Sequence, residues 1–217
     1  MTITLSAVHR RHLAALGGLP AIIDEEGLRI GTQYTMFFAE ADLMHQHAEH
    51  LLQGTSDADV LEIGLGLGVF AEQAARLGVG SYTAIEAHPG VARLAKRRIL
   101  AAFAGRATLI TEAWQLVALP TGAFDAIMYD TWPPDGHADA DFTYFVEHVA
   151  IPCLRPRGRF SFFHSGNQLS HTRQAVLSEH FAAVDAHPYT MPAKQTPPHW
   201  TKPSRNFVVP IATKTGS

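Results

Sequence analysis

Short apolar segments alternate with longer amphipathic segments along most of the chain. Runs such as residues 60–63 and 124–129 are bounded by polar turns, which is typical of buried strands. The segments between them have the length of helices, and Pro89 stands where a proline fits the first helical turn. We predict strands at residues 60–63, 81–85, 107–110, 124–129 and 159–163, a closing strand pair at 181–186 and 207–211, and helices at 69–77, 89–103, 142–154 and 169–180.

This alternation of strands and helices predicts an α/β fold with one doubly wound, mostly parallel sheet covered on both faces. Such sheets bind ligands beyond the carboxyl ends of their strands, at the point where the strand order reverses. Candidate site residues are therefore sought directly after strands.

The first 55 residues have a different pattern. A short helix is expected from Ser6 to Leu16, followed by turn-rich sequence up to residue 33. Residues 34–52 are predicted to form a helix with Met36, Glu40 and Met44 on one face, because these positions are four residues apart. The chain is thus expected to be one domain over residues 1–217, in which an N-terminal helical cap (1–55) contributes to the site of an α/β core (56–217).

Composition narrows the functional classes. Of the 217 residues, 47% are hydrophobic and 17% charged, which favours a large buried core over disorder. The net charge of −3 provides no basic field, so neither nucleic acid nor a membrane surface is an expected partner, and a small-molecule or protein substrate is favoured. With one cysteine and no recognisable signal or membrane-spanning segment, a cytoplasmic protein is expected. Monomer and homodimer both remain open.

Thirteen histidines do not predict a metal site. His45, His47 and His50 lie on one predicted helix, but residues two apart point to different faces. No HExxH or cysteine-paired spacing occurs in the chain, so no metal is expected.

A glycine-rich turn follows the first strand of the core. In the run from Glu62 to Gly68, glycines at 64, 66 and 68 allow backbone amides to approach a ligand at the start of a helix. The dinucleotide fingerprint requires a glycine where Val69 stands, which argues against a nicotinamide-linked oxidoreductase. The turn favours S-adenosylmethionine, with Glu62 near its ammonium and Glu86, at the end of the second strand, accepting its ribose hydroxyls. A tight turn without a ligand, or a non-catalytic scaffold of this fold, are the alternatives.

The run from Phe124 to Pro133, which contains Tyr129-Asp130-Thr131-Trp132-Pro133, is more particular. Together with residues 60–68 it resembles guanidinoacetate N-methyltransferases and the related arginine Nδ-methyltransferases. The likeness extends from about Leu28 to Lys214. It includes Trp114, the run Leu154–Gly158 and the spacing of Met36, Glu40 and Met44.

The resemblance implies S-adenosylmethionine as cofactor and a small guanidino compound as substrate. It implies a clamp for the guanidinium formed by Glu40 and Asp130. With the glycine turn and its flanking acids, the expected cofactor-binding residues are Met36, Met44, Glu62, Gly64, Leu65, Gly66, Leu67, Gly68, Val69, Phe70, Glu86, Ala87, His88, Trp114, Gln115 and Asp130.

Chemistry supports such a clamp independently. A guanidinium has planar donors that pair bidentately with carboxylates, and its delocalised lone pairs make it a poor nucleophile. A carboxylate beside the attacking nitrogen can take its proton as the methyl group transfers. We predict that Asp130 is this base and that Glu40 orients the acceptor. The alternatives are a strand-end cap for Asp130 and a solvated helix face for Glu40.

Two departures from the family pattern concern the substrate. The family often has a tryptophan in its N-terminal segment that covers the site. This chain has tryptophan only at positions 114, 132 and 200, so that residue is absent. Residues 163–168 replace the family's Leu-Thr-Ser-Trp-Gly, which holds the substrate carboxylate. The acceptor therefore stays open between guanidinoacetate, arginine and a related guanidino metabolite, and a methyltransferase with a different small-molecule or protein acceptor is the alternative.

Overall fold

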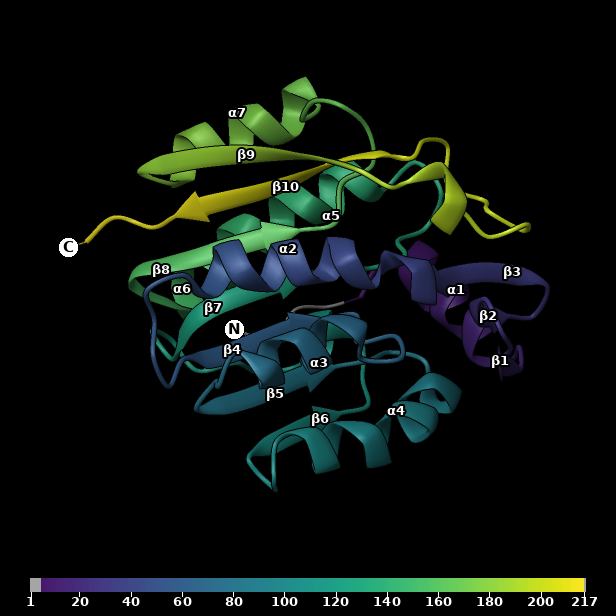
Figure 1. Ribbon diagram of the computed structural model, residues 1–217. Helices are drawn as coiled ribbons and strands as arrows, with labels where there is room; N and C mark the ends of the chain where they lie inside the picture. Colours follow the sequence, from purple (N-terminus) through teal and green to yellow (C-terminus); the bar gives the residue numbers. More distant parts are fainter. Residues whose placement is uncertain (1–4, 217) are drawn as a thin grey trace.

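A seven-stranded sheet forms the centre of the computed structural model, which describes residues 5–216 (Figure 1). The strand order is β6-β5-β4-β7-β8-β10-β9. The first five strands in this order are parallel, and β10 is antiparallel to both of its neighbours. This confirms the predicted α/β fold class. The strands are β4 (Asp59–Ile63), β5 (Ser81–Ile85), β6 (Ala107–Ile110), β7 (Phe124–Tyr129), β8 (Leu154–Phe162), β9 (Ala183–Thr190) and β10 (Asn206–Thr213).

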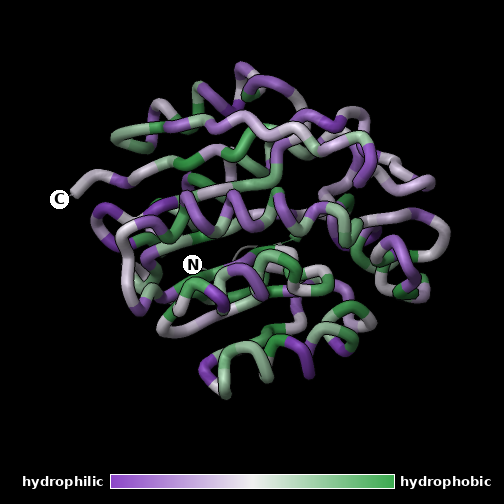
Figure 2. Tube along the Cα trace, in the orientation of Figure 1, coloured by the Kyte–Doolittle hydropathy of each residue, from purple (hydrophilic) through white to green (hydrophobic). Residues whose placement is uncertain are grey.

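Helices cover both faces of the sheet because side chains of the central strands alternate between two cores. Val60 and Met128 belong to the core beneath the first group of helices, whereas Leu61 and Ile127 face the second group. The first group comprises α2 (Ala41–Leu52), α3 (Val69–Arg76) and α4 (Pro89–Ala102), and the second α5 (Ala138–Phe145), α6 (Ile151–Cys153) and α7 (His171–His180). Hydrophobic residues concentrate in the middle of the molecule (Figure 2).

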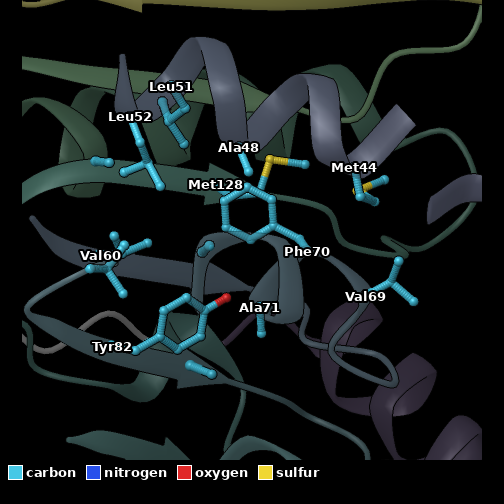
Figure 3. Close-up of a cluster of buried hydrophobic side chains, with 14 of the residues drawn as sticks. Met44, Ala48, Leu51, Leu52, Val60, Val69, Phe70, Ala71, Tyr82 and Met128 are labelled. Atoms are coloured by element: carbon cyan, nitrogen blue, oxygen red, sulfur yellow. The ribbon is translucent and has the colours of Figure 1, made fainter. Parts of the chain in front are cut away.

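The packing of α2 against the sheet positions one wall of the site. Figure 3 shows Met128 of β7 and Phe70 of α3 between this helix and the strands. Both side chains are almost fully buried, as is Ala48 of α2. Burying a side chain of the size of Phe70 or Met128 contributes about 1.5–3 kcal/mol. Met44, at the amino-terminal end of α2, is therefore held firmly where the sheet core reaches the strand ends.

The N-terminal region corrects the expectation of a helical cap. After α1 (Ala7–Gly17), residues 21–37 form a three-stranded antiparallel sheet of β1 (Ala21–Ile23), β2 (Gly27–Ile30) and β3 (Gln33–Phe37). A 3₁₀ turn (Phe38–Glu40) leads into α2, so the predicted helix over residues 34–52 begins only at Ala41.

Two local features explain why residues 33–37 form a strand. Gly31 has a φ of +61° and turns the chain between the paired residues Ile30 and Gln33. Tyr34 and Thr35 favour extended backbone. Met36, Glu40 and Met44 consequently lie on three different elements rather than on one helix face.

Most other element boundaries agree closely, but the strand predicted at residues 181–186 is β9 (Ala183–Thr190), and one helix differs as well. The predicted helix over residues 142–154 begins at Ala138, passes through a π-helical stretch (Val146–Ala150) and ends at Cys153. Leu154 already belongs to β8, which starts before the predicted Arg159. Among residues 5–216, no helix has the length and apolar character needed to cross a membrane.

The strand order reverses between β4 and β7. The backbone segments that follow these two strands are in close contact there. The amide of Asp130, directly after β7, donates to the carbonyl of Ile63 at 2.8 Å. A Cβ atom on Gly64 would lie 1.7 Å from the Asp130 carbonyl oxygen, and Gly64 has a φ of +84°. Only glycine fits this position, which brings the glycine turn and Asp130 to the same point.

Candidate active site

A cavity of about 410 Å³ lies at the carboxyl ends of β4, β5 and β7. Its walls come from the glycine turn, the ends of these strands, the small N-terminal sheet, α1 and the segment 201–203. This is the position in which doubly wound sheets bind ligands. Figure 1 shows the N-terminal elements, in purple, at this end of the central strands.

Glu86 links the glycine turn to the second strand. Its carboxylate accepts the Gly66 amide at 3.0 Å through Oε2 and the His88 amide at 2.8 Å through Oε1. Burial raises the pKa of Glu86 to about 7, although both hydrogen bonds favour the charged form. The carboxylate is thus held rigidly at the cavity wall by backbone donors on either side.

Glu62 is a second buried acid in the same wall. Only 2% of its surface is exposed, and the Tyr82 hydroxyl donates to its Oε2. Burial raises the pKa of Glu62 well above its usual value. A cationic ligand group beside Glu62 would favour the charged carboxylate, because an opposite charge offsets the loss of solvation.

Asp130 lines the cavity directly after β7, and Glu40, at the end of the 3₁₀ turn before α2, lies behind the cavity wall. Burial raises the pKa of Asp130 to about 6, the nearby Lys202 ammonium opposes this shift, and the Glu40 carboxylate adds to it. Glu40 is 2% exposed, and its Oε2 accepts the Phe37 amide at 2.8 Å. Its Oε1 lies 3.3 Å from the Lys202 ammonium. The alternative of a solvated helix face for Glu40 is therefore excluded. The two carboxylates influence each other, with a lysine beside them.

The sequence of this chain matches a known protein family over most of its length. A family model described as guanidinoacetate N-methyltransferase matches residues 23–185. The chain belongs to the guanidinoacetate N-methyltransferase family. The predicted family is therefore confirmed, and by its description it is a family of methyltransferases.

More distant relatives agree with this assignment. The chain is 33% identical over 129 residues to protein arginine N-methyltransferase 2 from Aspergillus oryzae, covering 57% of this chain and 30% of that protein. The same enzyme from Emericella nidulans is also 33% identical over 129 residues, with 57% of this chain and 29% of the relative covered. The chain therefore spans less than a third of the length of these relatives.

Solved structures share the fold at low sequence identity. An N-methyltransferase from Bradyrhizobium japonicum, in complex with S-adenosyl-L-homocysteine, superposes with a TM-score of 0.67 at 12% identity, covering 96% of this chain and 99% of the other. A SAM-dependent O-methyltransferase from Thermotoga maritima gives a TM-score of 0.58 at 16% identity, covering 84% and 67%. These likenesses support the fold.

Most residues predicted for the site of this family member line the cavity. Fourteen of the predicted residues do so: Met36, Met44, Glu62, Gly64, Leu65, Gly66, Val69, Phe70, Glu86, Ala87, His88, Trp114, Gln115 and Asp130. Trp114 and Met44 also pack in the buried cores, so each serves both the wall and the core.

Three predicted residues lie outside the cavity wall. Leu67 packs into a small core with Leu28 and Val91. Gly68 provides room for Ile99 of α4, whose Cδ1 would lie 2.5 Å from a Cβ atom there. Glu40 lies behind the wall and reaches the cavity through Lys202.

Several wall residues were missed because they lie far away in the sequence. Lys202 comes from the loop between β9 and β10, where neither periodicity nor a motif marks it. From α1, His9 pairs with Asp141, with 2.9 Å between Nε2 and Oδ2, and His12 donates to the Trp132 carbonyl at 2.9 Å. These contacts hold α1 over the cavity.

His137 lies beside the His9–Asp141 pair. Nitrogen and oxygen atoms of these three side chains lie within 4.8 Å of one another, a spacing that metal ligands also show. The hydrogen bond between His9 and Asp141 by itself accounts for their placement, and the expectation of no metal stays a prediction.

Proposed function

We propose that this protein transfers the methyl group of S-adenosylmethionine to a guanidino nitrogen of a small acceptor. The observation that carries the proposal is that Asp130 lines a cavity together with the glycine turn and Glu86, and that Glu40, behind the cavity wall, is near enough to raise the pKa of Asp130. A guanidinium is the cation whose planar donors best match paired carboxylates.

The chemistry assigns different tasks to the two carboxylates. With a pKa of about 6, Asp130 is mostly ionised at neutral pH and still basic enough to accept a proton. S-adenosylmethionine, when bound, would supply the methyl group to the acceptor nitrogen and would leave as S-adenosylhomocysteine. The N–H proton passes to Asp130. Glu40 keeps its orientation because it accepts the Phe37 amide. Its negative charge attracts the guanidinium from behind the cavity wall.

We expect Glu86→Gln to weaken binding of S-adenosylhomocysteine by about tenfold or more. The oxygen of the glutamine side chain can replace one of the two carboxylate oxygens that accept the Gly66 and His88 amides. The NH₂ group of the glutamine then faces the other backbone amide, so two donors meet. When S-adenosylhomocysteine is present at 100 times its dissociation constant, wild-type protein should gain about 2.7 kcal/mol of stability, which a thermal shift would show. Equal dissociation constants for Glu86→Gln and the exposed control Glu179→Gln would show that Glu86 has no part in the cofactor site.

The acceptor class is tested by methylation of a panel. We expect at least one of arginine, guanidinoacetate and related guanidino acids to be methylated, and lysine not to be, because an ammonium lacks the planar donors of a guanidinium. Labelled S-adenosylmethionine and mass spectrometry of the products give the answer. Preferential methylation of catechols, simple carboxylates or RNA would contradict the guanidino assignment and leave the methyltransferase intact.

A further inference from the structure

The side chain of Lys202 separates Glu40 from the cavity. Its ammonium lies 3.3 Å from Glu40 Oε1 and 4.3 Å from the centre of the Phe163 ring. Lys202 and Phe163 line the cavity, whereas Glu40 does not. A ligand cation that is to contact Glu40 must therefore enter the position that the lysine ammonium holds.

The two oxygens of Glu40 have different partners. Oε2 accepts the Phe37 amide at 2.8 Å and is thereby held by the fold. Oε1 accepts no hydrogen bond from residues 5–216, and the ion pair with Lys202 is the charged contact that Glu40 makes within them. Glu40 is 2% exposed, and a buried carboxylate without a counter-ion is costly. A cation beside Oε1 is therefore favoured, whether it belongs to the protein or to a ligand.

The protein offers one such cation at this point. Lys202 is the one lysine or arginine among the described lining residues of a cavity that also has five carboxylates: Glu62, Glu86, Glu112, Asp130 and Asp141. Its ammonium lowers the pKa of Asp130, which burial raises, so its charge acts on both carboxylates of the proposed clamp. Two cations in one small site repel each other. The ammonium and an incoming guanidinium therefore exclude one another beside Glu40.

The lysine side chain can leave this position without a movement of the loop. Before it, Trp200 packs against Phe37 with 4.9 Å between the ring centroids. After it, the Met191 amide donates to the Arg205 carbonyl at 2.9 Å. Between these anchors the Lys202 side chain is 20% exposed, and its flexible four-carbon stem allows the ammonium to rotate toward solvent.

We propose that Lys202 is an internal competitor of the acceptor, whose ammonium fills the cation position beside Glu40 in the free protein and is displaced when the guanidinium binds. This inference rests on the proposed function, because it assigns what occupies the guanidinium position before and after the reaction. The methylated product keeps its positive charge, so the returning ammonium favours its release.

The test measures how tightly guanidinium probes bind when the ammonium is removed. The probes are arginine, guanidinoacetate and methylguanidine, each titrated in the presence of saturating S-adenosylhomocysteine. Wild-type protein should bind at least one of them. Lys202→Met should bind that probe about threefold or more tightly, because no ion pair has to be broken first. In turnover, KM should fall by a similar factor and kcat should not rise.

Two further variants make the test specific. Lys202→Arg should weaken binding of the probe below that of wild type, since a guanidinium pairs with a carboxylate better than an ammonium does and competes more strongly. Lys194→Met, in the same inter-strand segment but outside the cavity wall, should behave like wild type. Thermal unfolding of each variant checks its fold.

A double-mutant cycle with Glu40→Gln separates competition at Glu40 from a general change in the charge of the cavity. Without the carboxylate, Lys202 has no ion pair to lose. Adding Lys202→Met to Glu40→Gln should therefore change the dissociation constant of the probe by less than about twofold. A general charge effect would tighten binding equally in both backgrounds.

Each other outcome has one meaning. Unchanged or weaker binding in Lys202→Met, or equal tightening in the Glu40→Gln background, would overturn this inference and leave the proposed function intact. If wild-type protein neither binds nor methylates a guanidino compound, the proposed function fails and this inference fails with it.

Discussion

Replacing Asp130 by asparagine should lower turnover by at least about 100-fold. General-base contributions are typically 10²- to 10⁴-fold, and asparagine keeps the shape of the side chain but cannot accept the proton. Binding of S-adenosylhomocysteine should change little, because the proposed partner of Asp130 is the acceptor. Single-turnover and steady-state kinetics of Asp130→Asn measure the loss.

The pH dependence and a matched variant separate base catalysis from ion pairing. In wild-type protein kcat/KM should rise with pH and level off above about pH 6, because burial raises the pKa of Asp130 to about 6 and only the carboxylate accepts a proton. Glu40→Gln keeps an oxygen for the Phe37 amide, so it should lose less turnover. Its pH profile should keep the same shape but move to lower pH, because the charge of Glu40 raises the pKa of Asp130. Retention of more than about a tenth of wild-type turnover in Asp130→Asn would exclude Asp130 as the base.

Replacing Gly64 by alanine should abolish cofactor binding and strongly destabilise the protein. The added Cβ would stand 1.7 Å from the Asp130 carbonyl oxygen, which is backbone and cannot rotate away. Either the glycine turn or the end of β7 must then move, and both form the cavity wall. Thermal unfolding and titration with S-adenosylhomocysteine measure the two effects.

Gly105 is a matched control for this substitution. Its φ is also +84°, but nothing lies within 4 Å of the position its Cβ would take. Gly105→Ala should therefore lose only the roughly 1–2 kcal/mol that a left-handed conformation costs an alanine, with cofactor affinity unchanged. Similar losses for the two variants would show that backbone conformation, and not the contact with Asp130, makes glycine necessary at position 64.

The central strands could be predicted from the sequence because their signals are local. Residues 81–85, 107–110 and 124–129 are short apolar runs between polar turns, and the structure has strands with these same bounds. The sheet between residues 21 and 37 escaped prediction because its stability depends on pairing between strands. In that segment, the four-residue spacing of Met36, Glu40 and Met44 imitates a helix face.

The site was predictable to the extent that its residues follow strands. Glu86 and Asp130 were found because each ends a strand at the edge where ligands bind. Lys202 was not, because its place beside Glu40 results from a contact over 162 positions of the chain that no local pattern encodes. Glu40 was predicted at the site from the resemblance, but its place at the end of a 3₁₀ turn rather than on the face of a long helix depends on the fold.

The insertion of β10 between β8 and β9 has a consequence for biosynthesis. Residues 59–130, which supply the glycine turn, Glu86 and Asp130, emerge from the ribosome well before β10, and their parallel strands pair with one another. β8 and β9 expose unpaired edges until residues 206–213 arrive to join them. The loop carrying Lys202 leads directly into β10 and is also held by hydrogen bonds between His199 and Glu26. The core beside the glycine turn is also completed late, because Phe207, Val209 and Ile211 of β10 pack in it with Met44 and Phe70. A ribosome stalled before residue 206 would therefore hold a nascent chain in which this core is unfinished.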